Sequence, residues 1–164
     1  MSIRSKSIPK KVYKFVYRQD ISIQTNITGR TFENEWLLIA IDGKITVKGS
    51  HYKGYAWDGC SPKGNFIDLT WGTPDGRLDF STERPITFFA SMIHDVLYQY
   101  KNNVPISRKE TDILFLITLQ EATFKLTGLY YWAVRAFGGF YGSWAKVESQ
   151  DDIKITNFSW KLNS

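Results

Sequence analysis

The segment at residues 85–100 reads PITFFASMIHDVLYQY, and it combines a strongly apolar run with one adjacent pair of polar side chains, His94 and Asp95. The run follows Pro85, and it predicts a helix from about Ile86 to Tyr100. Because burying a charge without a partner is costly, two interpretations of the pair are open. Either His94 and Asp95 hold the core together through paired contacts, or they belong to a functional site.

Two further helices are predicted after this segment. The second begins at Ser107, where Ser107 and Glu110 match a capping box, and it continues to about residue 125. The third runs from about residue 129 to residue 137, before a pair of glycines. Helical spacing predicts that the aromatic side chains of this third helix lie mostly in the core; they are Tyr130, Tyr131, Trp132 and Phe137.

Strands are predicted on both sides of the helices. Residues 12–24 alternate as expected in a sheet, residues 36–47 form a hairpin around Asp42-Gly43, and a short strand covers residues 52–56. A last strand at about residues 153–162 slips by one residue in its apolar phase, which indicates a bulge. The Asp42-Gly43 pair is a strong indication of the hairpin turn, because glycine tolerates the positive φ that a two-residue turn needs.

These elements predict one α+β domain spanning residues 1–164, with an antiparallel sheet packed beside three helices. The sheet would come from about residues 12–56 and 153–162, and the helical core from residues 85–143. Residues 57–84 are rich in glycine and proline and are expected to form a long site loop.

Composition limits the class of protein. The chain has 164 residues, 43% of them hydrophobic and 16% aromatic, which excludes a disordered protein. Its single cysteine excludes an intramolecular disulfide. No apolar stretch is long enough for a membrane span, and no signal peptide is apparent, so synthesis in the cytoplasm is expected.

The net charge is +5, and much of the excess lies near the N-terminus. Two interpretations are open: the basic residues keep the protein soluble, or they contact an acidic surface such as nucleic acid, anionic lipid or an acidic partner. No recognisable nucleic-acid-binding module accompanies the charge, so specific recognition of nucleic acid is not expected.

The spacing of polar residues on the helices suggests a catalytic pair. His94 and Tyr98 share one helix face, and Asp112 lies on the apolar face of the second helix, where a carboxylate needs partners. If Asp112 binds one ring nitrogen of His94, the other nitrogen can take a proton from water. The same three residues could instead form a buried polar network that only fixes helix packing.

A cation site is predicted beside this pair. Asp58 and Asp95 could share a hard cation such as calcium, which binds carboxylates together with backbone carbonyls on tight turns. Asp58-Gly59 is such a turn, and Gly59 would allow an inward-pointing carbonyl. The cation would polarise a substrate carbonyl while His94 activates the attacking water.

Four sequence blocks follow one another between about residues 57 and 138. They are Asp58-Gly59-Cys60-Ser61-Pro62, His94-Asp95-Val96-Leu97-Tyr98, Ser107-Arg108 with Asp112, and Tyr130 to Gly138. In the same order, these blocks resemble small phage and bacterial proteins of a domain-of-unknown-function family, and also the secreted bacterial phospholipase A₂ enzymes. The enzymes have an Asp-x-Cys loop, a His-Asp-x-x-Tyr helix, a Ser-Arg-x-Asp block and a Tyr-Tyr-x-Ala-Val-x-x-Phe-Gly segment.

The resemblance implies a phospholipase A₂-like helical core and assigns roles to the site residues. His94 would be the base, Asp112 its orienting carboxylate and Tyr98 a support for Asp112. Calcium would bind Asp58, Asp95 and the Gly59 carbonyl. The chain departs from the enzymes in several respects. Asp112 follows Ser-Arg two residues later, the disulfides and a secretion signal are missing, the stretch at residues 63–84 is longer, and the N-terminal sheet has no counterpart.

Three hypotheses about function follow from the residues and the resemblance. The first is a calcium-dependent lipid esterase of the phospholipase A₂ kind, used by a phage at the host envelope. The second is a non-catalytic phage virion component, such as a tail, neck or capsid-associated protein, built on the same scaffold. The third is an intracellular phage accessory protein. The expected partners are other virion proteins or further copies of this chain, and a phospholipid surface for the esterase.

Overall fold

Alternating apolar and polar residues build the larger of two antiparallel sheets in the computed structural model, which describes residues 13–59, 78–79, 82–125, 127–137 and 143–161. This sheet has five strands in the order β3-β4-β5-β2-β7. Every second side chain of β2 is buried, so one face of the sheet contributes to the core. The strands are β2 (Ile21–Thr25), β3 (Phe32–Glu33), β4 (Leu37–Ile39), β5 (Lys44–Val47) and β7 (Ile155–Phe158).

The hairpin predicted around Asp42-Gly43 is confirmed as β4 and β5. Leu37 pairs with Val47 and Ile39 pairs with Ile45. Gly43 has a φ of 86°, and a Cβ atom there would come within 2.4 Å of the Thr25 carbonyl oxygen. Glycine is therefore required at this turn for both its backbone conformation and its lack of a side chain.

The bulge predicted in the last strand is also confirmed. Gln24 of β2 pairs with Asn157, and the next residue, Thr25, pairs with Ile155. Thr156 is the extra residue of this bulge. Because the bulge shifts the alternation by one position, Phe158 faces the core again.

The alternation predicted over residues 12–24 is confirmed as β structure, but this stretch contributes strands to two different sheets. β1 (Phe15–Tyr17) pairs with β6 (Tyr55–Trp57) in a two-stranded sheet, whereas β2 pairs with β5. The chain changes sheet at the exposed residues 18–20. Gly49 packs against the backbone of this segment. A Cβ atom on residue 49 would come within 2.1 Å of the Gln19 carbonyl oxygen.

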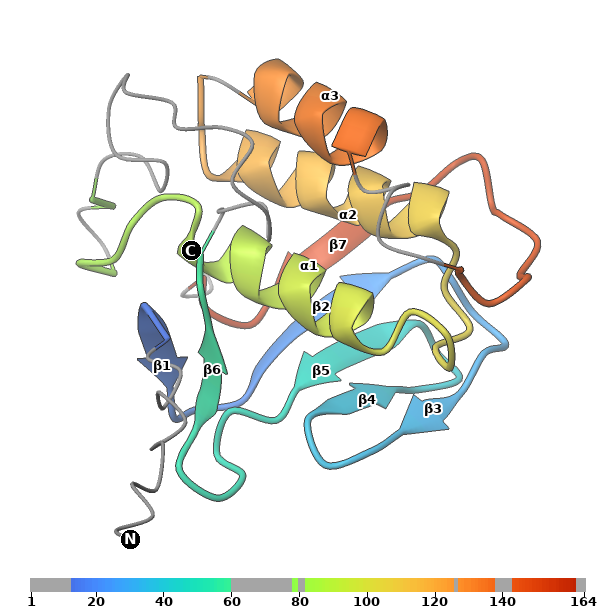
Figure 1. Ribbon diagram of the computed structural model, residues 1–164, viewed down its shortest axis with the longest axis horizontal. Coiled ribbons are helices and arrows are strands. Elements are labelled where there is room, and N and C mark those ends of the chain that lie inside the picture. The colour runs from blue at the N-terminus through green and yellow to red at the C-terminus, as the bar shows by residue number, and fades with distance from the viewer. Residues whose placement is uncertain (1–12, 60–77, 80–81, 126, 138–142, 162–164) are drawn as a thin grey trace, which may run out of the picture.

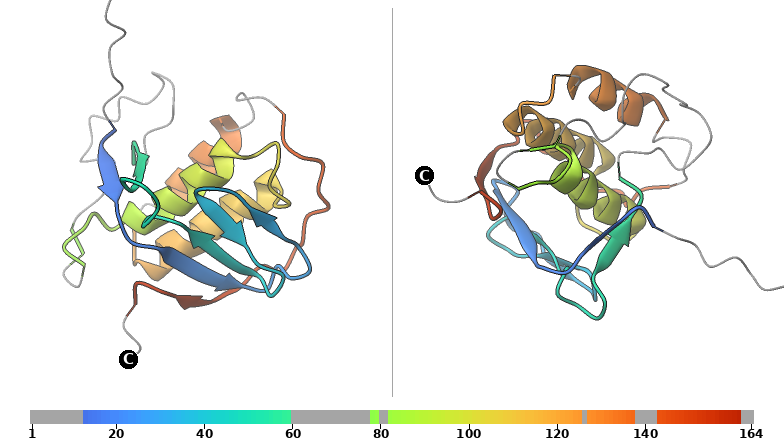
Figure 2. Two further views of the ribbon diagram at one scale, coloured as in Figure 1. Left: turned by 90° about the horizontal axis from the view of Figure 1, so that it is seen from below. Right: turned by 90° about the vertical axis from the view of Figure 1, so that its left-hand side faces the viewer.

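Three helices lie on the same side of the larger sheet (Figures 1 and 2). They are α1 (Phe88–Gln99), α2 (Arg108–Glu121) and α3 (Thr127–Phe137), close to the predicted ranges. α1 lies nearest the sheet and packs against α2, and α2 packs against α3. The capping box is confirmed: the Ser107 side chain accepts from the Glu110 backbone, and the Glu110 side chain accepts from the Ser107 backbone.

The main core lies between α1 and the buried face of the larger sheet. From the second sheet, Trp57 is fully buried and donates from its indole Nε1 to the Ser91 hydroxyl at 3.0 Å. A smaller cluster joins the helices through Ala90, Phe115 and Leu119. Across the described ranges, no helix has the length and apolar character needed to cross a bilayer.

The predicted burial of the aromatic residues of α3 is wrong for Trp132, whose relative exposure is 61%. Tyr130 is half-buried and packs against the smaller cluster, and Tyr131 is half-buried as well. The side chain of Phe137 lies outside the described part of the chain. Trp132 is exposed because α3 is the outermost helix and covers α2 with only one face.

Truncation of a side chain at the junction of the two sheets and α1 should be severely destabilising. Phe88 is 2% exposed and contacts the rings of Phe15 and Trp57. We expect Phe88→Ala to lower the free energy of unfolding by about 3–5 kcal/mol, measured by urea denaturation. The control Ile41→Ala, at a side chain 67% exposed, should change it by less than about 0.5 kcal/mol.

Candidate functional site

The site is organised around the carboxylate of Asp112, in the second turn of α2. The apolar residues around it place this side chain inside the helical layer, where it is 0% exposed. A carboxylate removed from water needs partners for both oxygen atoms. The structure supplies them from all three helices.

One oxygen of Asp112 faces α1. The Nε2 atom of His94 lies 3.3 Å from Oδ1, and the Tyr98 hydroxyl donates to the same oxygen at 2.8 Å. The predicted contact between His94 and Asp112 is therefore confirmed, and Tyr98 is in the same cluster. The three residues meet because His94 and Tyr98 are one turn apart on the helix face that packs against α2.

The other oxygen, Oδ2, faces two arginines that are not among the predicted site residues. Arg135 of α3 donates from Nη1 at 3.0 Å, and the Nε atom of Arg108 lies 3.7 Å away. Arg108 also donates to the backbone carbonyl of Arg135. Arg108 and Asp112 are four residues apart on one helix, and this spacing indicates their contact. No local sequence pattern indicates the contact of Arg135 with Asp112.

Electrostatics keep Asp112 ionised. Burial alone would raise the pKa of Asp112, but hydrogen bonds from His94, Tyr98 and Arg135 outweigh it and hold the pKa below the ordinary range. Burial raises the pKa of Tyr98, and the neighbouring Asp112 carboxylate raises it further, so Tyr98 remains a neutral donor. The cluster therefore contains a fixed negative charge beside the imidazole of His94.

The imidazole of His94 is held in place but is not sealed from solvent. Its ring lies 4.2 Å from the Tyr98 ring and 4.6 Å from the Phe115 ring, centroid to centroid. Its side chain is 16% exposed. Within the described ranges, no hydrogen-bond partner contacts its second ring nitrogen, Nδ1. With Asp112 bound at Nε2, the lone pair of Nδ1 can accept a proton.

Asp95 contacts β6, the strand that Asp58 directly follows. Asp95 faces β6, where the buried Tyr55 hydroxyl donates to its Oδ2 at 2.8 Å. Asp58 and Gly59 directly follow β6, and Gly59 has a φ of 75°. Burial, followed by the charge of Asp95, raises the pKa of Tyr55, which keeps this hydroxyl a donor.

The calcium ligands predicted at Asp58, Gly59 and Asp95 stay a prediction. In the part of the chain that the structure describes, no group of three or more His, Cys, Asp and Glu side chains lies close enough to share a metal. Most of the predicted site loop, residues 60–77 and 80–81, lies outside the described residues, as does Cys60.

Comparison of the chain with models of known protein families, with curated proteins and with solved structures found no match. The resemblance to phospholipase A₂ rests on the four sequence blocks and their order alone, and it stays a prediction.

Replacing the central carboxylate should weaken folding in a pH-dependent way. The pKa of Asp112 is lowered by folding, so its contribution is present at neutral pH and is lost as the pH falls below about 4. We expect Asp112→Asn to cost about 3 kcal/mol of unfolding free energy at pH 7 and much less near pH 2, measured by urea denaturation.

The matched control is Asp151→Asn, which removes an exposed carboxylate that pairs with Lys109 at 2.7 Å. This variant should behave like the wild type at both pH values, because a solvent-exposed ion pair contributes little. A wild-type stability for Asp112→Asn at pH 7 would show that the cluster does not hold the helices together.

Proposed function

We propose that this protein is a hydrolase in which His94 acts as the general base. The observation that carries the proposal is the contact of His94 Nε2 with the buried Asp112 carboxylate, which leaves Nδ1 available on a side chain that is partly exposed. In this geometry Asp112 fixes the tautomer and orientation of the ring. Nδ1 accepts a proton from water, and the resulting hydroxide attacks an electrophilic carbonyl carbon.

The proposed substrate class is carboxylic esters, with phospholipids as the first candidates. Support comes from the order of the four blocks that resemble secreted bacterial phospholipase A₂. These blocks include His94, Tyr98 and Asp112. Tyr98 supports the reaction indirectly, because it donates to the same Asp112 oxygen as His94 and limits movement of the carboxylate. A calcium ion held by Asp58 and Asp95 would polarise the ester carbonyl, but proton transfer to His94 does not depend on it.

One observation favours a second candidate, a non-catalytic protein such as a phage virion component. Arg135 and Arg108 both approach the Asp112 oxygen opposite His94. These cations share the negative charge of Asp112 and reduce its ability to stabilise a protonated imidazole. In this alternative the cluster serves only to fix the three helices relative to one another.

His94→Asn separates the two candidates, since it keeps a hydrogen-bonding side chain but removes the base. If the protein is a hydrolase, this variant should lose at least about 100-fold in the rate of ester hydrolysis while remaining folded in a thermal melt. Fatty-acid release from phospholipid vesicles is the measurement, with calcium or with a chelator present.

The control is His51→Asn, which changes the only other histidine of the chain. His51 is exposed and packs edge-on against the Trp36 ring, away from the Asp112 cluster, so its replacement should leave hydrolysis unchanged. If the wild type hydrolyses no phospholipid or simple ester, with or without calcium, the hydrolase hypothesis is rejected and the non-catalytic role is favoured. Full activity of His94→Asn would reject His94 as the base.

A further inference from the structure

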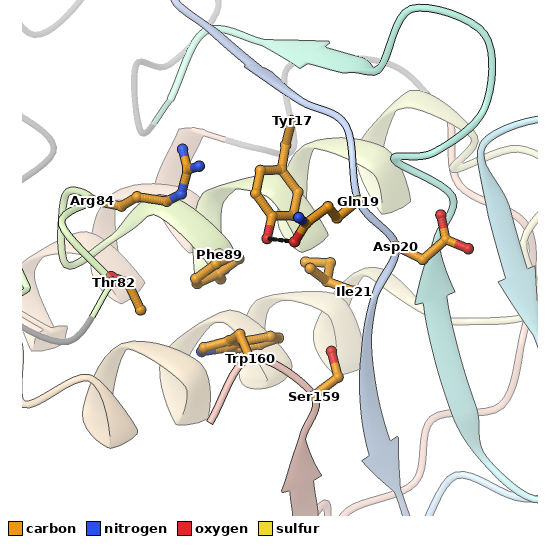
Figure 3. Close-up of a pocket in the computed structure, with 9 residues that line it drawn as sticks. All are labelled: Tyr17, Gln19, Asp20, Ile21, Thr82, Arg84, Phe89, Ser159 and Trp160. Carbon is orange, nitrogen blue, oxygen red and sulfur yellow. Dashed lines mark hydrogen bonds between the residues drawn. The ribbon is translucent and has the colours of Figure 1, made fainter. Parts of the chain in front are cut away.

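The two-stranded sheet has one face that takes no part in the core. In β1, Phe15 contacts the Trp57 ring and Tyr17 contacts the Phe89 ring, so these two side chains point inward (Figure 3). Successive side chains of a strand point to opposite faces, so the alternate positions point outward. The residues at those positions are all exposed, and they are Lys14, Val16 and Arg18.

Gly54 brings the loop that precedes β6 against the outer side of β1. A Cβ atom on residue 54 would come within 2.8 Å of Arg18 Cγ and 2.9 Å of Val16 Cγ1, so glycine is required for this close approach. The Arg18 Nε atom donates to the Lys53 carbonyl at 3.3 Å. The loop therefore places a second exposed cation, Lys53, next to Arg18.

Tyr52 in the same loop is held in an unfavourable conformation. It is a central residue of the turn closed by the bond from the Gly54 amide to the His51 carbonyl at 3.0 Å, and its φ is 49°. The left-handed region is costly for a residue with a Cβ atom, and Tyr52 gains little burial in return, because it is 80% exposed. Its ring contacts the Lys53 ammonium, which lies 5.4 Å from the centroid. Backbone strain of this kind is typical of functional sites.

Positive charge predominates at this outer surface, which we call the basic face and which consists of Lys14, Val16, Arg18, Tyr52 and Lys53. Acidic residues follow both strands, Asp20 after β1 and Asp58 after β6, but the sequence that enters β1 supplies a larger excess of cations. Every charged residue in the range 1–19 is basic; these residues are Arg4, Lys6, Lys10, Lys11, Lys14 and Arg18. Because this stretch runs directly into β1, its charge is tied to the basic face, which therefore attracts anions.

The side chains of the basic face suit a lipid surface better than a nucleic acid. Lysine and arginine are attracted to anionic lipids, and tyrosine favours the boundary between headgroups and hydrocarbon. Val16 is 48% exposed between two cations, and it adds apolar area that can enter this boundary. The phosphate backbone of a nucleic acid offers no such apolar layer.

We propose that the basic face docks the protein on the surface of an anionic phospholipid bilayer. The choice of this partner rests on the proposed function, because docking would bring a hydrolase of phospholipids to its substrate. The face belongs to the N-terminal sheet, which has no counterpart in the phospholipase A₂ enzymes, so it is a feature of this chain.

The test is flotation of the full chain with vesicles of diether phospholipids, which contain no ester bond, so binding is measured whether or not the protein is a hydrolase. We expect binding to phosphatidylglycerol mixed with phosphatidylcholine, none to phosphatidylcholine alone, and weaker binding at higher salt. Arg18→Gln combined with Lys53→Gln should weaken binding by roughly 10- to 30-fold, because each cation near an anionic surface contributes about fivefold. Tyr52→Ser should weaken binding by several-fold and leave its salt dependence unchanged.

The matched control is Lys44→Gln combined with Lys146→Gln, which removes the same charge from two exposed lysines at the start of β5 and between α3 and β7. The segment between α3 and β7 lies on the other side of the molecule from β1 (Figure 1). The control should bind the vesicles like the wild type, and both double variants should have its melting temperature.

Equal weakening in the two double variants would show attraction by net charge alone and would overturn the proposal. So would the absence of wild-type binding to the anionic vesicles. Binding to single-stranded oligothymidylate in place of the vesicles, lost on replacing Arg18 and Lys53, would assign the basic face to nucleic acid instead. Vesicle binding as expected, without hydrolysis of ester phospholipids, would reject the hydrolase and keep the docking surface.

Discussion

The buried charge of Asp112 is the constraint on which the arrangement of the helices depends. Its two oxygen atoms are bound by side chains from α1 and α3, while its own backbone belongs to α2. A carboxylate without exposure to solvent is stable only while these partners stay within hydrogen-bond distance. The rotation of each helix about its axis is therefore fixed more tightly than apolar packing alone would fix it, since apolar contacts are not directional.

A second buried carboxylate gives α2 a connection to the rest of the fold. Glu110 is two residues before Asp112, so the two side chains point about 160° apart around the helix. Glu110 accepts from Arg30, in the connection between β2 and β3, at 2.7 Å, and from the Gln150 backbone at 2.8 Å. Adjacent turns of α2 thus contact different parts of the fold. Glu110 binds the connection between β2 and β3, and Asp112 binds the other two helices.

Much of this architecture could be predicted from local sequence. The hairpin around Gly43, the capping box at Ser107 and the bulge in the last strand each depend on a few neighbouring residues, and each is confirmed. The contact between His94 and Asp112 was also predictable, because both lie on helix faces that must be buried. These features share one property: a short pattern sets the backbone geometry or the direction of a side chain.

The remaining features depend on segments that are distant in sequence. Residues 12–24 have the alternation of one strand, and only the close approach of Gly49 to Gln19 shows where the chain changes sheet. Arg135 lies 23 positions from Asp112, and Tyr55 lies 40 positions from Asp95, so no periodicity links either pair. The exposure of Trp132 likewise depends on α3 being the outermost helix, which its own sequence does not indicate.

The pairing of β7 with β2 has a consequence for how the chain reaches this fold. Ser159, at the end of β7, accepts a hydrogen bond from the Ser22 amide, 137 positions earlier. On a ribosome the early strands emerge long before their neighbour exists, and β2 remains an open edge throughout that time. Closing such a long loop is entropically costly and slows folding. The nascent chain is therefore prone to β-strand aggregation at this edge until β7 has been synthesised.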